Sequence, residues 1–172
     1  MWPDALPDDL VFNVNYLGGN MPTFALNFSR PGNQVAAQYY NFIRLGFDGY
    51  KQVQQASRDV ARYTAEEIAK LPAFRLLTDG SELPVLAFTL AQTDVPYTVF
   101  DVSRLLRERG WLVPAYTFPE NRQDLAVLRV VVRNGFSHDL ADMLVSDLQR
   151  HVAFLEKLPA PLPSTGHQSF RH

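Results

Sequence analysis

The apolar positions near the start of the chain fall into two short runs. "LVFNVNYLGG" and "PTFALNF" are separated by the Gly18-Gly19 pair, and this pattern predicts a β-hairpin. A two-stranded hairpin is marginally stable by itself in water, so we expect its apolar side chains to need another surface. These residues are Val11, Phe12, Leu17, Phe24, Leu26 and Phe28.

A helical pattern follows the hairpin. From Val35 to Lys70 the apolar residues recur every three or four positions, which predicts one long helix that ends before Pro72. Gly46 and Gly49 lie inside it, and each costs about 1 kcal/mol relative to alanine. We therefore expect a bend or a break at these glycines.

Two strands and a helix then occur twice in succession between Phe74 and Leu158. The strand-like runs are "FRLLTDG", "LPVLAFTL", "WLVPAYTF" and "DLAVLRVVVR". Thr98 with Asp101 predicts a capped first helix that stops at Gly110, and Ser137 predicts the cap of the second. This order indicates an α+β fold with a mainly antiparallel sheet and helices on one face.

The whole chain accordingly divides into four parts. We expect residues 1–34 to carry the hairpin, 35–71 the long helix, 72–158 the small α+β domain, and 159–172 a flexible tail.

Composition and charge exclude several classes of protein. The 172 residues are 47% apolar and carry a formal charge of −2, which gives no electrostatic reason for a nucleic-acid or anionic-membrane partner. There is no cysteine, no run of about 20 apolar residues and no secretory signal pattern at the start. We expect a soluble, cytoplasmic protein.

The four histidines show no metal-ligand spacing, so no metal site is predicted, and we expect His151 on a helix surface.

Arg129 is the first candidate for chemistry. Strand alternation in "LAVLRVVVR" places this permanent cation in the middle of an apolar strand. A buried guanidinium needs a partner, which is either a carboxylate of the protein or an anionic ligand. The residues alone leave both alternatives open.

The stretch "LNFSRPGNQ" is the second candidate. Ser29 and Arg30 stand just before the long helix, whose free amides favour a nearby anion. Ordinary turn chemistry is the commoner explanation of such residues, and a solvated arginine needs no ligand.

Three segments resemble a known family. "LVFNVNYLGGNMPTFALNFSRPGNQVAAQYYNFIRLGFDGY", "RERGWLVPAYT" and "LAVLRVVVRNGF" are similar to consecutive segments of the bacterial glutamate decarboxylases, which are pyridoxal-phosphate enzymes of the aspartate-aminotransferase fold. The resemblance implies that the hairpin and the long helix are the end of a large cofactor domain, followed by a small C-terminal domain. It also implies that the full-length enzyme converts L-glutamate to 4-aminobutanoate and consumes a proton, a reaction suited to acid resistance. It further implies an assembly of at least two subunits.

The resemblance also implies roles for particular residues. Arg129 matches the arginine that receives the substrate α-carboxylate, and Phe28 and Ser29 match residues that reach the cofactor phosphate of the neighbouring subunit. Tyr16 and Leu17 match the hairpin tip that enters the neighbouring active site. His172 matches a histidine that closes the site at neutral pH, but it is the last residue here, where the family usually has one more.

One part of the family pattern is missing. Lys51, Lys70 and Lys157 are the only lysines, and none has the context of the lysine that binds the cofactor covalently. We therefore expect these residues alone to be inactive. The alternative function is a freestanding, non-catalytic module that binds a full-length subunit.

Overall fold

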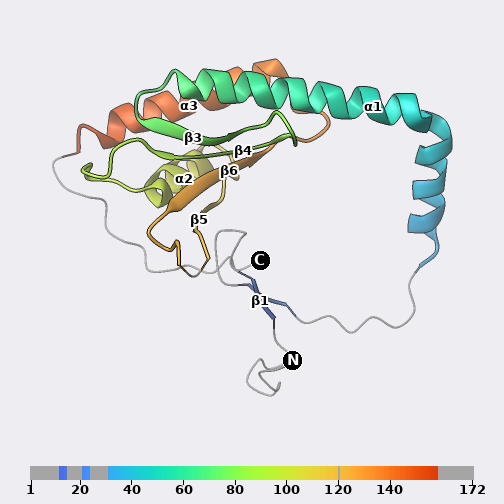
Figure 1. The fold of residues 1–172 in the computed structure, drawn as a ribbon, viewed down its shortest axis with the longest axis horizontal. Coiled ribbons are helices and arrows are strands. Elements are labelled where there is room, and N and C mark those ends of the chain that lie inside the picture. Colours follow the sequence, from blue (N-terminus) through green and yellow to red (C-terminus); the bar gives the residue numbers. More distant parts are fainter. Residues whose placement is uncertain (1–11, 15–20, 24–30, 120, 159–172) are drawn as a thin grey trace.

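The computed structural model describes residues 12–14, 21–23, 31–119 and 121–158. Their elements follow the order β1, β2, α1, β3, β4, α2, β5, β6 and α3 (Figure 1). Among the described residues, no helix has the combination of length and apolar character needed to cross a bilayer.

The predicted hairpin is present. Strands β1 (Phe12–Val14) and β2 (Met21–Thr23) pair in antiparallel register, with Phe12 opposite Thr23. The two strands form a sheet of their own, separate from the larger one.

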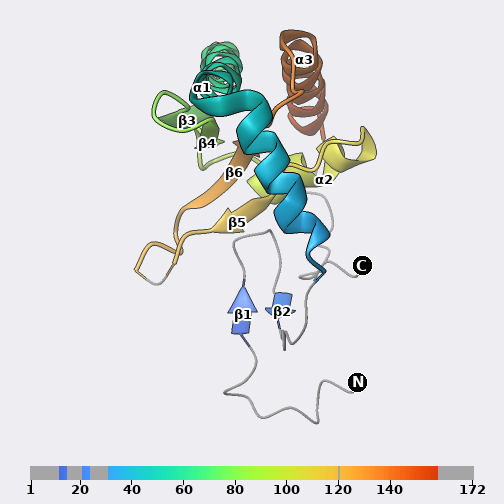
Figure 2. The same cartoon turned by 90° about the vertical axis from the view of Figure 1, so that its right-hand side faces the viewer.

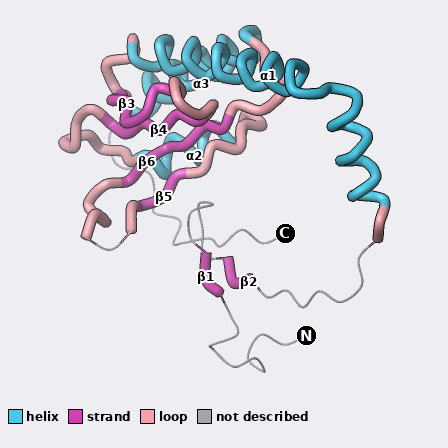
Figure 3. The backbone as a smooth tube through the Cα atoms, turned by 45° about the vertical axis from the view of Figure 1, so that its right-hand side comes forward, coloured by secondary structure: helices cyan, strands magenta, loops and turns pink. Residues whose placement is uncertain are grey.

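Helix α1 (Asn33–Ala69) has two halves that differ in their surroundings. Gly46, with φ 56° and ψ −170°, is the one residue inside it with non-helical angles, and the helix axis turns sharply there (Figure 3). The buried residues of α1 all lie beyond this turn, from Ser57 to Ile68. Only the second half therefore packs on the sheet domain.

The larger sheet has four strands in the order β3-β4-β6-β5, and all neighbours are antiparallel. The strands are β3 (Phe74–Asp79), β4 (Val85–Leu90), β5 (Ala115–Thr117) and β6 (Ala126–Val131). The predicted α+β class is confirmed. The strand expected from "WLVPAYTF" is shorter than predicted, because only three of its residues pair with β6.

Helices α2 (Val99–Glu108) and α3 (His138–Leu155) complete the domain. Thr98 and Asp101 form the predicted capping box, and the Ser137 hydroxyl accepts a hydrogen bond from the Leu140 amide.

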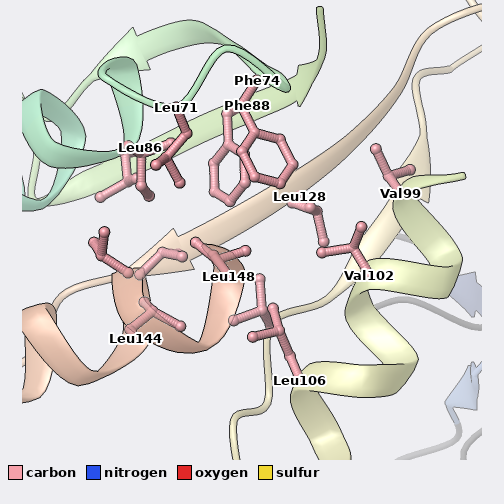
Figure 4. Packing of buried hydrophobic residues seen from close by; sticks show 14 of the residues in the cluster. Leu71, Phe74, Leu86, Phe88, Val99, Val102, Leu106, Leu128, Leu144 and Leu148 are labelled. Atoms are coloured by element: carbon pink, nitrogen blue, oxygen red, sulfur yellow. The ribbon is translucent and has the colours of Figure 1, made fainter. Parts of the chain in front are cut away.

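One apolar core joins these helices to the sheet. Leu86 and Phe88 of β4 meet Leu128 of β6, and Leu144 and Leu148 of α3 pack against them (Figure 4). All three helices contribute to this cluster. They cover the same face of the sheet (Figure 2). No described helix covers the opposite face, although Val127 and Thr89 on it are buried.

Candidate functional site

Arg129 lies on the face of the sheet opposite the helices, in the central strand β6. The neighbouring residues Leu128 and Val130 are buried in the core, so alternation turns the Arg129 side chain away from the helices. Its backbone amide donates to the carbonyl of Pro114 at 3.1 Å, and its partner on β4 is Ala87. The side chain is half-buried.

Tyr116 of β5 flanks Arg129 on the other side. The guanidinium carbon lies 5.5 Å from the centre of the Tyr116 ring, within the range of a cation–π contact. Tyr116 is itself half-buried and pairs in register with Val127, two residues before Arg129 on the same face. The ring therefore restrains the guanidinium laterally without neutralising its charge.

This arrangement has a definite chemical capacity. A guanidinium presents its N–H groups as a planar fork that matches both oxygens of a carboxylate. Arg129 sits on a strand that is hydrogen-bonded on both edges, so the fork is carried by a rigid part of the fold. Rigid placement reduces the entropy lost when a carboxylate binds.

Two cavities of the described residues lie elsewhere. One, of about 220 Å³, is lined by residues that include Leu90, Tyr97 and Glu156. The other, of about 170 Å³, lies along α1 beside Arg62 and Tyr63. Arg129 lines neither of these two cavities.

The remaining site residues expected from the sequence fall outside the described residues. These are Tyr16, Leu17, Phe28, Ser29 and His172. Their expected roles stay predictions.

The lysines were tested for the covalent cofactor linkage that the resemblance implies. Lys51, Lys70 and Lys157 are all exposed, and Lys70 forms an ion pair with Glu67 on the same helix. None lines either cavity. The described residues therefore do not fit the covalent binding of pyridoxal phosphate by themselves. The described part of the chain also contains no group of three acidic or histidine side chains placed to hold a metal ion.

A buried polar cluster between α2 and α3 escaped the sequence analysis. The Trp111 indole N–H donates to Asp147 at 2.9 Å, and Arg109 Nε donates to the other carboxylate oxygen at 3.2 Å. Burial alone would raise the pKa of the Asp147 carboxyl, but these hydrogen bonds and the charges of Arg109 and Arg150 lower it. The cluster ties the segment after α2 to the middle of α3.

His151 belongs to the same region, and its expected surface position was wrong. The side chain is buried one turn beyond Asp147, and burial lowers the pKa of its imidazole. The signal was available in the sequence: Leu144, Asp147, Leu148 and His151 recur every three or four residues, as the positions of a buried helix face do.

Comparison with known proteins gives consistent matches. Residues 3–91 match the model of the pyridoxal-dependent decarboxylase conserved domain. The chain is 52% identical over 163 residues to a glutamate decarboxylase of Aliivibrio fischeri, which covers 92% of the chain and 35% of that protein. A glutamate decarboxylase of Solanum lycopersicum is 48% identical over 161 residues, covering 94% and 32%.

A solved structure agrees with the sequence matches. The glutamate decarboxylase of Lactobacillus brevis superposes with a TM-score of 0.73 at 44% identity, over 91% of this chain and 36% of that one. The chain therefore spans about a third of the length of the relatives that it matches.

Proposed function

Because the chain belongs to the pyridoxal-dependent decarboxylase family, we propose that it acts as the C-terminal part of a glutamate decarboxylase. The reaction converts L-glutamate to 4-aminobutanoate and carbon dioxide and consumes one proton. The family's cofactor is pyridoxal 5'-phosphate. The observation that carries the proposal is the position of Arg129. Its guanidinium lies beside the Tyr116 ring, on a central strand and on the sheet face opposite the helices.

Arg129 binds the α-carboxylate of the substrate in this proposal. Two parallel N–H···O contacts fix the plane of that carboxylate, and Tyr116 keeps the guanidinium from swinging along the sheet. Fixing the carboxylate also fixes the bond from it to the α-carbon, which is the bond that breaks. The contribution of this chain to catalysis is thus orientation.

The covalent cofactor linkage comes from outside this chain, since the described lysines are all exposed. Ser29 and Phe28 serve the cofactor phosphate of a neighbouring subunit, and Tyr16 and Leu17 enter that subunit's site. His172 closes the site at neutral pH. These assignments rest on the family resemblance, as do a dimeric or larger assembly, a cytoplasmic location and a role in acid resistance.

A chimera tests the role of Arg129. In it, this chain replaces the matching third of the Aliivibrio fischeri glutamate decarboxylase. We expect Arg129→Ala to lower kcat/KM for glutamate roughly 100- to 1,000-fold, because two charge-assisted hydrogen bonds are lost. Arg129→Lys should recover only part of the loss, since an ammonium cannot form the bidentate contact.

The matched control for this test is Arg133→Ala. Arg133 is an exposed cation four residues further along the chain, so its removal should leave kcat/KM within about twofold. Equal effects at both positions would contradict the proposal. The isolated chain, incubated with pyridoxal phosphate and borohydride, should gain no stoichiometric lysine adduct.

A second candidate function is a non-catalytic module that binds a full-length decarboxylase subunit. The exposed apolar residues in the first half of α1 favour a binding role of this kind. A chimera that keeps full activity when Arg129 is replaced by alanine would favour this module.

A further inference from the structure

The larger of the two cavities lies at the edge of the domain where α1 and α3 both end. The two helices lie side by side and run in the same direction, so that both end on the left in Figure 1. Pro72, which follows the end of α1, and Glu156, the first residue beyond α3, both line this cavity. Most of the remaining wall comes from the segment between β4 and α2. Three parts of the chain that are distant in sequence therefore meet around it.

One part of the cavity wall is apolar. Ala73, Leu90 and Val95 line the cavity, and all three pack against the hydrophobic core. Tyr97 is buried and adds an aromatic residue to the wall. A ligand that fits here therefore has an apolar body, which leaves water when it binds.

The other part of the wall carries negative charge. Glu156 is the one charged side chain among the residues that line the cavity. Its carboxylate stands at the C-terminal end of α3, where helix carbonyls carry a partial negative charge, and the end of α1 adds a second partial charge of the same sign. Neither helix has a basic residue in its last turn. Burial raises the pKa of the Tyr97 phenol, and the Glu156 charge raises it further, so this hydroxyl is uncharged at neutral pH.

The positive groups nearby do not cancel this charge. Lys70, at the end of α1, forms an ion pair with Glu67, and Lys157 is exposed and does not line the cavity. The start of α2 has a partial positive charge, but the Asp101 carboxylate accepts hydrogen bonds from Thr98 there. The cavity therefore favours a cation over an anion.

The volume limits the size of that cation. A cavity of about 220 Å³ corresponds to roughly seven water molecules of about 30 Å³ each. Pockets for drug-sized ligands and cofactors are larger, at about 300–1,000 Å³. A metal ion is a poor match, because Mg²⁺ and Ca²⁺ need several oxygen ligands and Glu156 is the one carboxylate in the wall. A short chain with one positive end satisfies both the size and the charge.

We propose that this cavity binds a short primary alkylammonium ion. The ammonium group donates hydrogen bonds to the Glu156 carboxylate near the carbonyl ends of the two helices, and the alkyl chain covers Leu90 and Val95. The Tyr97 ring adds to the attraction of a cation. A ligand that also carries a carboxylate binds less well, because Glu156 repels it. The site does not include Arg129, so this proposal stands or falls separately from the proposed function.

An NMR titration of the full 172-residue chain with n-butylammonium chloride tests the proposal. The amide signals of Ala73, Tyr97 and Glu156 should shift together and saturate, with a Kd on the order of 1 mM. Butanol and butanoate have the same carbon chain without the positive charge, and they should bind at least about tenfold more weakly. The zwitterion 4-aminobutanoate should also bind more weakly, and sodium chloride at equal ionic strength is the blank.

Three variants locate the binding site. Glu156→Gln should weaken the binding of butylammonium at least about tenfold, because a neutral amide replaces the charged acceptor. The matched control is Glu108→Gln, which removes an exposed glutamate at the end of α2 that does not line the cavity, so the Kd should stay within about twofold. Ala73→Leu should abolish the saturating shifts by filling the cavity while the carboxylate stays in place. Amide signals remote from the cavity report whether each variant keeps the fold.

Any of three results would overturn the proposal. One is the absence of saturating shifts up to about 50 mM butylammonium, far above the expected Kd. Another is equal binding of butanol or butanoate, which would mean that the charged wall does not select the ligand. The last is an equal loss of affinity in Glu156→Gln and Glu108→Gln, which would identify a general attraction of cations to the protein surface.

Discussion

At the scale of single residues, Arg129 and Asp147 have different surroundings. Arg129 lies on the face of the sheet opposite the helices, whereas Asp147 lies between α2 and α3 with two donors on its oxygens. Asp147 is 5% exposed. Its hydrogen bonds therefore hold the packing of the two helices rather than a substrate.

Replacing Asp147 tests this structural role. In Asp147→Ala the Trp111 indole N–H loses its acceptor in a partly buried place, so we expect the free energy of unfolding to fall by about 2–3 kcal/mol. Asp147→Asn keeps one acceptor oxygen, so its free energy of unfolding should fall by less. Urea unfolding followed by tryptophan fluorescence measures both.

A surface carboxylate provides the comparison for Asp147. Asp142 accepts a hydrogen bond from Tyr63 on the exposed side of α3. Asp142→Ala should cost under about 1 kcal/mol, because water replaces the lost partner. A similar loss of unfolding free energy in both variants would show that the buried cluster stabilises the fold no more than an exposed hydrogen bond does.

Sequence reasoning was effective for side chains in strands and weaker for polar side chains in helices. The alternation around Arg129 placed the core residues Leu128, Val130 and Val132 on one face, as found. Asp147 and His151 share the helix spacing of Leu144 and Leu148, so the sequence contained a signal of their burial. The partners of Asp147 could not be predicted locally, because Arg109 and Trp111 lie 38 and 36 positions away along the chain.

At the scale of elements, local signals gave the helices with good accuracy. The pattern from Val35 to Lys70 predicted α1 to within two residues at its start, and the Thr98–Asp101 capping box is present as expected. Helix caps and the helical repeat of apolar residues depend on residues three or four positions apart, so both can be predicted from a short stretch of sequence. Sheet order depends on distant segments, and the β3-β4-β6-β5 order was not predicted.

The turn in α1 depends on Gly46. Its φ of 56° with ψ of −170° is a combination that residues with a Cβ rarely adopt. In Gly46→Ala we expect the helix to straighten, because alanine favours helical angles by about 1 kcal/mol over glycine. The first half of α1 would then continue along the axis of its second half.

Spin labels measure this change conveniently because the chain has no cysteine. With labels at Gln38→Cys and Gln55→Cys, straightening should lengthen the distance towards the roughly 25 Å between backbones of a continuous helix. Gly49→Ala is the control for a Cβ added near the turn, since Gly49 has no positive φ and its added Cβ would lie 3.0 Å from the Leu45 Cβ. An unchanged distance in Gly46→Ala would contradict this explanation of the turn.

At the scale of the whole molecule, the chain combines a complete core with an uncovered extension. The sheet, α2, α3 and the second half of α1 share one apolar cluster. The first half of α1 adds no residue to that cluster. The apolar periodicity predicted a helix in both halves of α1 equally. A periodic pattern indicates which face of a helix is apolar, but it does not indicate which other element covers that face.

The stability of the core should depend on pH through His151. Burial lowers the pKa of this imidazole, although Asp147 and Glu108 act in the opposite direction and Arg109 and Arg150 reinforce the shift. An unfolded histidine has a pKa of about 6.5, so below that pH the unfolded state binds the proton more readily than the folded state. The free energy of unfolding should therefore fall as the pH drops below about 6.5, until the lower folded pKa is passed.

The carboxylate of Asp147 does not contribute in that range. Its pKa is lowered by folding, so its stabilisation is present above the unfolded value of about 3.9 and is lost only below it. Urea unfolding between about pH 7.5 and 5 thus isolates His151. His151→Gln should flatten the pH dependence, whereas His138→Gln, at an exposed position, should preserve it. If the slope persists in His151→Gln, the acid sensitivity of the fold arises elsewhere, and the buried imidazole is a tolerated core residue without influence on acid stability.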